Sequence, residues 1–282
     1  MIDMHIHTTE SDGSNTMEDI LQYCIQKKIK VLGITDHWKT KRYSEDFYVN
    51  DISNYLKRCC QLKETAYKYG IVVFAGLEVD FTEKYGFFID NDDIKKFNQL
   101  DFILFEYVNT ENESWGTVNG KSIDSLFEIR DHLTIPVGLA HNDFFDNFKN
   151  NYEAIIKEMS KKDIFLELCE GEVLGKEKVN ALSLKKLLTL KKNMSDLDLY
   201  KAKAPIIRKK HMRNDMFYFE HFPSYLWELI KEYRLPLSVS TDNHSGSCLG
   251  EHPRADEYLK KYQLYDQLIL GLGDDYEANL SR

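Results

Sequence analysis

The sequence predicts an α/β protein built on a parallel sheet, and a single barrel is the simplest such architecture. Short apolar segments alternate with amphipathic helical segments along nearly the whole chain, which is typical of repeated βαβ units. The chain has 282 residues, an ordinary length for one barrel. Asp, Glu or His follows almost every apolar segment directly, and in parallel barrels the functional side chains gather at the carboxyl ends of the strands.

Hydrophobic periodicity and capping signals give the expected elements in order. Thr16 is a suitable N-cap with Asp19 three residues later, so the first helix is expected to run from there to about Lys28. Further helices are expected over residues 51–69, 91–99, 122–131, 152–160, 176–190 and 223–233. The expected strands are residues 2–7, 30–35, 71–75, 102–105, 135–140, 164–168 and 235–240.

No internal repeat and no Gly/Ser-rich linker marks a domain boundary. We therefore expect residues 1–282 to form one domain. The one break in the strand–helix rhythm falls at about residues 192–221. It predicts an insertion or lid between the sixth and seventh strands rather than a separate domain.

Composition narrows the classes of function. The chain carries 37 basic and 46 acidic residues, a net charge of −9, which opposes binding to extended nucleic acid but leaves room for one phosphate at a local metal cluster. No apolar run is long enough to cross a bilayer, and a motif that begins at residue 3 leaves no room for a leader. The five cysteines are odd in number and lack paired spacings, so we expect thiols in a reducing cytoplasm.

The segment Asp3-Met4-His5-Ile6-His7 is the first candidate for chemistry. Three alternate positions carry carboxylate or imidazole, and alternate side chains of a strand point to one face. These groups are the usual protein ligands of divalent transition metals. The alternative is a polar, solvent-facing strand edge with two incidental histidines.

Matching groups recur at the ends of later strands. Besides the first segment, the groups are Ser11-Asp12-Gly13, Thr35-Asp36-His37, Gly76-Leu77-Glu78-Val79-Asp80, Ala140-His141-Asn142-Asp143 and Ser240-Thr241-Asp242-Asn243-His244. In their order and positions these groups resemble the polymerase and histidinol phosphatase (PHP) superfamily, over residues 2 to about 255, and the histidinol-phosphatase branch in particular. That resemblance implies a distorted seven-stranded (β/α)7 TIM-like barrel with a trinuclear metal site at the C-terminal ends of its strands.

The resemblance also implies a set of ligands for two or three divalent ions, zinc, manganese or iron. Asp3 would support the metal-bound imidazoles from outside the coordination sphere, or would simply begin the strand. Glu78 would bridge the first ion to the second. The first ion would be held by His5, His7, Glu78 and Asp242, the second by Glu78 and His141, and the third by Asp12, His37 and His244.

The chain departs from the family pattern in two places. The family normally has a Ser-Val-His phrase after the fourth strand, whereas this chain reads Phe105-Glu106-Tyr107. Either Glu106 replaces the imidazole and favours harder ions such as Mn²⁺ or Fe²⁺, or the second site is weaker or empty.

The second departure is the absence of the arginine that histidinol phosphatases carry after the sixth strand, since residues 167–172 are acidic here. The candidates for binding a substrate phosphate are therefore Arg208, Arg213 and Arg254, although the basic run at 208–213 could equally be a solvated face. His132, His221 and His252 lie within or beside helices and are expected to be structural or surface residues.

The expected function is that of a metal-dependent phosphoesterase acting on a small phosphomonoester, with a hydroxide that bridges the metals as nucleophile. Asp36 or His244 would protonate the leaving oxygen, though Asp36 could equally orient a ligand. The alternatives are a nucleotide or nucleic-acid phosphodiesterase, metal-dependent amide hydrolysis on a similar barrel, and a metal-binding module without turnover.

Overall fold

The computed structural model describes residues 1–87, 89–113, 116–149, 151–171, 211–214, 216–246 and 248–269. The helix predicted at 176–190, the candidate Arg208 and most of the predicted insertion lie outside these residues.

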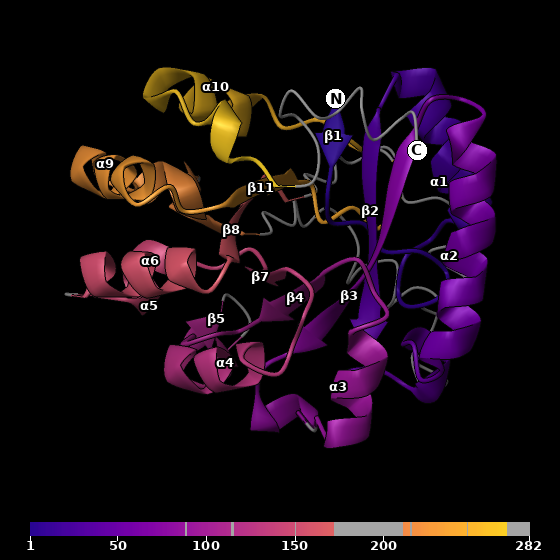
Figure 1. Cartoon of the computed structure of the whole chain (residues 1–282), viewed down its shortest axis with the longest axis horizontal. Helices are drawn as coiled ribbons and strands as arrows, with labels where there is room; N and C mark the ends of the chain where they lie inside the picture. The colour runs from indigo at the N-terminus through magenta and orange to yellow at the C-terminus, as the bar shows by residue number, and fades with distance from the viewer. Residues whose placement is uncertain are drawn as a thin grey trace, which may run out of the picture.

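Seven parallel strands form the central sheet, as the sequence predicts (Figure 1). The two edge strands approach each other, because Met4 N donates to Val239 O at 3.1 Å and Ile6 forms a parallel bridge with Asn243. The sheet is therefore a nearly closed barrel, and the α/β barrel prediction is confirmed. In sheet order the strands are β1 (Ile2–Asp3), β2 (Val31–Trp38), β3 (Val72–Asp80), β4 (Ile103–Glu106), β7 (Val137–Leu139), β8 (Ile164–Cys169) and β11 (Leu237–Ser240).

Two strands, β2 and β3, run several residues further than predicted. We expected β2 to end at Thr35 and β3 at Ala75, but both continue in register, with His37 opposite Glu78. Polar residues were interpreted as marking the strand ends, whereas here they continue the ladder in the buried mouth of the barrel. In contrast, β1 is shorter than the predicted residues 2–7.

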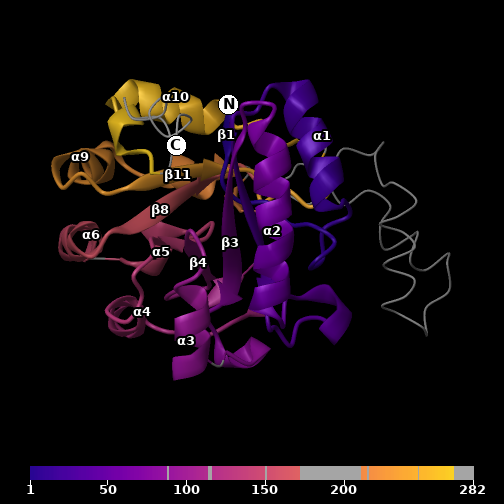
Figure 2. The same ribbon diagram turned by 45° about the vertical axis from the view of Figure 1, so that its right-hand side comes forward.

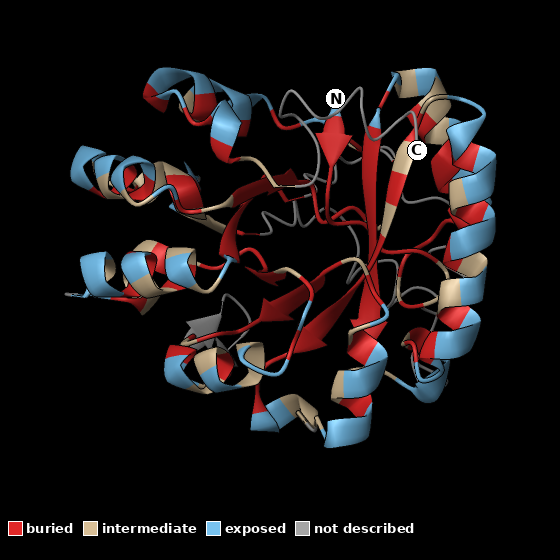
Figure 3. Ribbon diagram, in the orientation of Figure 1, coloured by how far each residue is buried: buried red, intermediate tan, exposed pale blue. Residues whose placement is uncertain are grey.

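Helices cover the outside of the barrel, and their exposed faces point away from the strands (Figures 1 and 3). Figure 2 shows α2 in front of β3, against which it packs. Thr16 caps α1 through a capping box with Asp19, as predicted, and Lys28 ends the helix in the left-handed conformation. The helices are α1 (Met17–Lys27), α2 (Ile52–Tyr67), α3 (Asn91–Phe97), α4 (Ile123–Arg130), α5 (Phe144–Asn147), α6 (Tyr152–Lys161), α9 (Ser224–Glu232) and α10 (Pro253–Tyr262), of which α5 and α10 were not anticipated.

Short elements complete the described part of the chain. The hairpin β5 (Asn112–Glu113) and β6 (Gly116–Thr117) follows β4, and the hairpin β9 (Met212–Arg213) and β10 (Met216–Phe217) precedes α9. The 3-10 turns are η1 (Glu45–Phe47), η2 (Glu83–Tyr85), η3 (Tyr218–His221) and η4 (Tyr265–Gln267).

Two sequence predictions can be checked on the fold as a whole. Among the described residues, no helix combines the length and apolar character needed to span a membrane. The five cysteines all lie within the described residues and none forms a disulfide, as expected.

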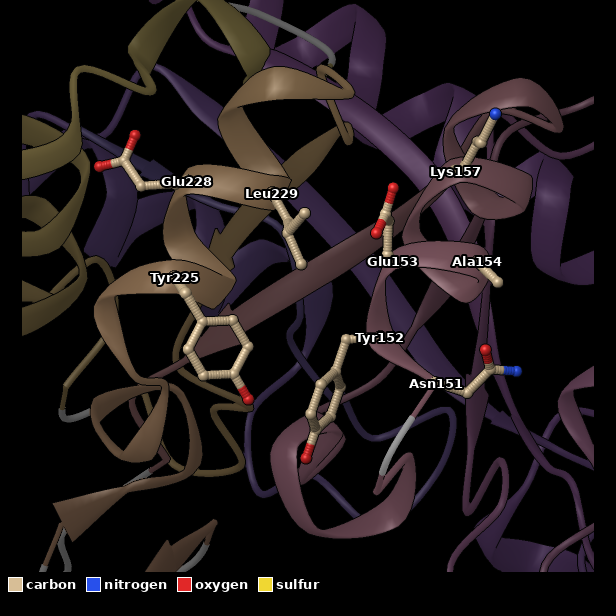
Figure 4. A pocket seen from close by; sticks show the side chains of 8 residues that line it. All are labelled: Asn151, Tyr152, Glu153, Ala154, Lys157, Tyr225, Glu228 and Leu229. Carbon is tan, nitrogen blue, oxygen red and sulfur yellow. The ribbon is translucent and has the colours of Figure 1, made fainter.

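The core fills the space between strands and helices, and all of the strand residues of β2, β4, β7, β8 and β11 are buried (Figure 3). A groove on the outer surface lies between α6 and α9 and is lined by Tyr152, Glu153, Lys157 and Tyr225 among others (Figure 4). None of its lining residues is a candidate ligand.

Candidate metal centre

Buried histidines and carboxylates converge at the mouth of the barrel. Among the described residues, five groups of three or four such side chains offer ligand atoms within 4.8 Å of one another. Several residues belong to more than one group, so the groups are contiguous. The members are His5, His7, Asp12, His37, Glu78, Asp80, Glu106, His141, His211, Asp242 and His244.

The first group joins the start of the chain to its last strand. The Nε2 atoms of His5 and His7 lie 3.0 Å apart, and Asp242 Oδ1 lies 3.6 Å and 3.1 Å from them, respectively. Ile6, between the two histidines, is buried in the core, as alternation on an extended segment requires. Against the lowering effect of burial, the Asp242 and Glu78 carboxylates raise the pKa of His7 to about 9. The group therefore attracts positive charge strongly.

Glu78 stands at the centre of the constellation. Its Oε1 lies 2.9 Å from His141 Nε2 and 3.4 Å from His5 Nε2, while its Oε2 lies 3.3 Å from His7 Nε2 and 3.1 Å from His37 Nδ1. Burial alone would raise the pKa of this carboxyl, but the surrounding imidazoles hold it well below its usual range. Each oxygen faces a different set of nitrogens, which is the geometry of a bridging carboxylate.

Asp12 forms the third group. Its Oδ1 lies 3.2 Å from His244 Nε2, 3.6 Å from His7 Nδ1 and 3.7 Å from His37 Nε2. This oxygen is buried and has no hydrogen-bond partner in the described part of the chain. A buried carboxylate oxygen facing three imidazole nitrogens fits a divalent ion.

Two of these histidines are prepared for coordination by their surroundings. Burial lowers the pKa of His37 to about 3, against the attraction of Asp12, and nearby Arg42 lowers it further, so the ring is neutral and can bind a metal. His244 directs Nδ1 to the Asp242 carbonyl at 2.9 Å, which turns Nε2 toward Asp12.

The family follows from a model of the PHP domain, which matches residues 3–272. The chain belongs to the PHP domain family. Proteins with this domain are typically metal-dependent phosphoesterases. The resemblance inferred from the strand-end motifs is thus confirmed, although no curated protein sequence matches the chain.

Two solved structures share the PHP fold with this chain. Histidinol phosphate phosphatase from Lactococcus lactis subsp. lactis, solved with zinc, L-histidinol and phosphate, is 14% identical, with a TM-score of 0.53 and 93% of each chain covered. The putative histidinol phosphatase from Listeria monocytogenes is 15% identical, with a TM-score of 0.51, and the match covers 90% of this chain and 99% of that one. At these identities the likeness shows the fold alone.

Asp3 does not support the imidazoles of the PHP site as expected. Its carboxylate accepts hydrogen bonds from Thr241 Oγ1 at 2.6 Å, Thr241 N at 3.1 Å and Gly250 N at 2.8 Å, and so fastens the first strand to the last. The supporting carboxylate is Glu167, whose Oε1 lies 3.0 Å from His5 Nδ1. Glu167 Oε2 also accepts from the His141 backbone N at 2.5 Å. From the sequence, Glu167 was noted only as part of an acidic stretch at the end of the sixth strand.

Asp36 lies beneath the loop that carries Asp12. It accepts from Thr8 N at 2.7 Å, Thr8 Oγ1 at 2.8 Å and Ser11 Oγ at 2.6 Å, and Ser11 Oγ is 3.4 Å from His7 Nδ1. These contacts favour the alternative that Asp36 orients a ligand. Its role as a proton donor stays a prediction.

Glu106 contacts both the candidate metal centre and Arg42, a residue that the sequence analysis did not single out. Its Oε1 lies 3.8 Å from His141 Nε2, while Oε2 pairs with Arg42. Arg42 also pairs with Asp80, which lies opposite Glu106 in register, and donates to Tyr107 Oη at 2.9 Å. Two carboxylates opposite each other on adjacent strands repel, and the guanidinium relieves that repulsion. Arg42 could have been predicted only from the pairing of Asp80 with Glu106 on adjacent strands, and a single sequence does not reveal strand register.

The three arginines predicted to bind substrate have different positions. Arg213 pairs with Asp143 and Asp146 at 3.5 Å and 2.9 Å. Arg254 is half exposed on α10, where it pairs with Glu220 at 2.8 Å and Glu257 at 2.7 Å. Arg208 lies outside the described residues, so the substrate role of all three stays a prediction.

The remaining histidines differ in their contacts. As expected of structural residues, His221 Nε2 lies 2.8 Å from the Arg213 carbonyl and His252 Nε2 lies 2.6 Å from the Ile2 carbonyl, and His132 is exposed. His211, which the sequence suggested only as one cation of a basic run, is buried against the centre, with Nε2 2.8 Å from Asp242 Oδ2.

Proposed function

We propose that this protein is a divalent-metal-dependent phosphoesterase that hydrolyses a small phosphomonoester. The observation that carries the proposal is the position of Glu78, whose two oxygens face different imidazoles and so join neighbouring donor groups into one centre. Two or three ions held in this way would neutralise phosphate charge and lower the pKa of water at the centre.

The donor set indicates which ions would bind. His5 and His7 with Asp242, and His37 and His244 with Asp12, combine imidazole with carboxylate, which suits zinc, manganese or iron. Buried carboxylates beside these imidazoles would also reduce the repulsion between closely spaced cations.

The open side of the centre lies at Asp12 and His244, whose side chains are 16% and 18% exposed, whereas His5 and Glu78 are almost completely buried. A phosphate ester would therefore approach from this side. His244 could act either as a metal ligand or as the general acid, but not as both at once. When Nε2 binds the third ion, this nitrogen has no proton to give, so His244 would protonate the leaving oxygen only where that ion is not bound.

The choice of a small substrate draws on the shared fold. The Lactococcus protein was solved with L-histidinol and phosphate, which makes histidinol phosphate the first compound to test. The net charge of −9 opposes binding to long nucleic acid, which supports a small monoester over a polynucleotide.

The experiment is to measure bound metals by mass spectrometry and hydrolysis of an aryl phosphate, an aryl phosphodiester and histidinol phosphate. We expect two or three ions per chain and faster hydrolysis of monoesters, with none in a Glu78→Gln control. Faster hydrolysis of the diester would favour the phosphodiesterase alternative. Full metal occupancy without hydrolysis of any ester would favour the metal-binding module.

A further inference from the structure

His211 lies at the start of the segment that leads into β9, on the connection between β8 and β11. Its side chain is buried, and its ring stacks on that of His141 with 3.8 Å between centroids and 17° between planes. Nε2 lies 2.8 Å from Asp242 Oδ2. His141, His211 and Asp242 each offer a ligand atom within 4.8 Å of the others.

The separation of His211 from Asp242 matches that of the other donor pairs in the centre. His5 and His7 approach to 3.0 Å, and Glu78 and His141 to 2.9 Å. Ligands bound to one zinc at about 2.0–2.2 Å lie about 3–3.5 Å from each other, so all of these pairs are close to ligand–ligand spacing.

The backbone gives a second, independent indication. His141, His211 and Asp242 all have positive φ, at 28°, 58° and 44°. Non-glycine residues are uncommon in this region, each costs about 1–3 kcal/mol there, and such residues cluster at functional sites. Eight other described non-glycine residues also have positive φ, but these three are the ones that bring metal-ligating donor atoms together.

The position of His211 would also supply a nitrogen ligand near His141, where the chain has Glu106 in place of the family's histidine. On the β4 side, Glu106 gives one oxygen to Arg42 and holds the other 3.8 Å from His141. On the opposite side of His141, the imidazole of His211 stacks on the ring of His141. The two oxygens of Asp242 point in different directions, Oδ1 toward His5 and His7 and Oδ2 toward His211.

We infer that His211 is a metal ligand, holding an ion together with His141 and Asp242, and that Asp242 bridges this ion to the one at His5 and His7. The inference rests on the metal centre of the proposed function. It adds one described residue of the connection between β8 and β11 to the coordination sphere. The competing role is that of a positioning residue, in which His211 only donates a hydrogen bond to Asp242.

Two substitutions separate these roles. His211→Gln keeps a donor that can reach Asp242 but replaces imidazole with a poor metal ligand, whereas His211→Ala removes both. His221→Ala is the matched control, because His221 belongs to the same segment and bonds the Arg213 carbonyl. Each protein is equilibrated with Co²⁺ or Zn²⁺, and bound metal and the visible cobalt spectrum are measured.

We expect both His211 variants to bind one ion fewer than the wild type and to lose part of the cobalt absorption, with the control unchanged. Retention of the full complement and spectrum by His211→Gln would overturn the inference and leave His211 as a positioning residue. If neither variant folds, long-range ¹H–¹⁵N spectra of the zinc-loaded wild type decide, because coordination shifts the ring nitrogen of His211. A wild type that binds no metal at all would instead defeat the proposed function.

Discussion

At the scale of single residues, Glu78 is the side chain on which the centre depends most. It is buried and lies within 3.4 Å of nitrogens from His5, His7, His37 and His141. Removing its charge would leave neighbouring cations without a shared counter-charge.

We therefore expect Glu78→Gln to release at least one ion and to reduce kcat by a factor of about 10³ or more, as loss of a main electrostatic contribution does. Metal analysis and steady-state kinetics check this. Unchanged stoichiometry with near-normal turnover would contradict the bridging role.

Glu106 gives the second residue-scale prediction. If it replaces the missing imidazole, Glu106→Ala should remove one ion and most of the activity, and the wild type should be more active with Mn²⁺ than with Zn²⁺. Glu106→His should keep the site and shift the preference toward Zn²⁺. Glu106→Gln is the control for the bond to Arg42, because an amide oxygen can still accept it. Undiminished metal in the alanine variant would assign Glu106 to Arg42 alone.

At the scale of elements, the loop that carries Asp12 packs tightly against the segment that follows β1. A Cβ on Gly13 would lie 2.4 Å from the His7 carbonyl oxygen and 2.6 Å from Thr8 N, both backbone atoms that cannot move cheaply. Because Gly13 has no Cβ, the loop can approach closely enough for Asp12 Oδ1 to lie 3.6 Å from His7 Nδ1.

Gly13→Ala should therefore displace the loop and weaken the Asp12 group. We expect loss of the third ion, with a loss of stability of about 1–3 kcal/mol from the steric conflict. Titration with Zn²⁺ and denaturant unfolding measure the two effects. A variant with normal metal content would show that the loop can shift without moving Asp12.

His252 links the first strand to α10. Its Nε2 is 2.6 Å from the Ile2 carbonyl, and Asp256 Oδ2 lies 3.5 Å from Nδ1. Although burial lowers the pKa of this imidazole, its carboxylate neighbours raise it to about 9. The protonated form is therefore favoured by folding.

Because the folded pKa is raised, the stabilisation is fully present below about pH 6.5 and is lost as the pH rises to about 9. We expect it to be about 2 kcal/mol. Denaturant unfolding between pH 6 and pH 9.5 should show a smaller decline in His252→Gln than in the wild type. Parallel curves would contradict the assignment.

These elements also show how far the sequence leads. Strands and helices could be predicted because apolar periodicity is a local property of the sequence. Five members of the centre could be predicted because they stand in short motifs at the ends of expected strands: His5, His7, Glu78, His141 and Asp242. Arg42, Glu167 and His211 could not, because their roles come from contacts across the barrel. Asp3 was misread for the same reason: its partners, Thr241 and Gly250, lie at the other end of the chain.

At the scale of the whole molecule, the barrel closes between β1 and β11, and both edges carry candidate ligands. His5 and His7 follow β1, and Asp242 follows β11, where Asp3 already joins the two. An ion bound there would link the beginning and the end of the barrel.

Metal binding should therefore stabilise the entire fold. An ion at 100 times its Kd contributes about 2.7 kcal/mol, so a chelator should lower Tm by several degrees. We expect one cooperative transition if residues 1–282 form one domain, and a smaller response in Glu78→Gln. Differential scanning calorimetry with and without EDTA measures both, and a Tm insensitive to the chelator in the wild type would contradict the link.

Because Arg42 pairs with both Asp80 and Glu106, a substitution at position 42 or 106 changes the effect of a substitution at the other. A single exchange of Glu106 for histidine leaves the guanidinium with one carboxylate fewer in a buried place, and a single loss of Arg42 leaves two carboxylates facing each other. We therefore expect substitutions at positions 42 and 106 to be non-additive. Glu106→His alone can keep the metal site, but it should lower the stability of the fold more than the same exchange made together with a neutral residue at position 42.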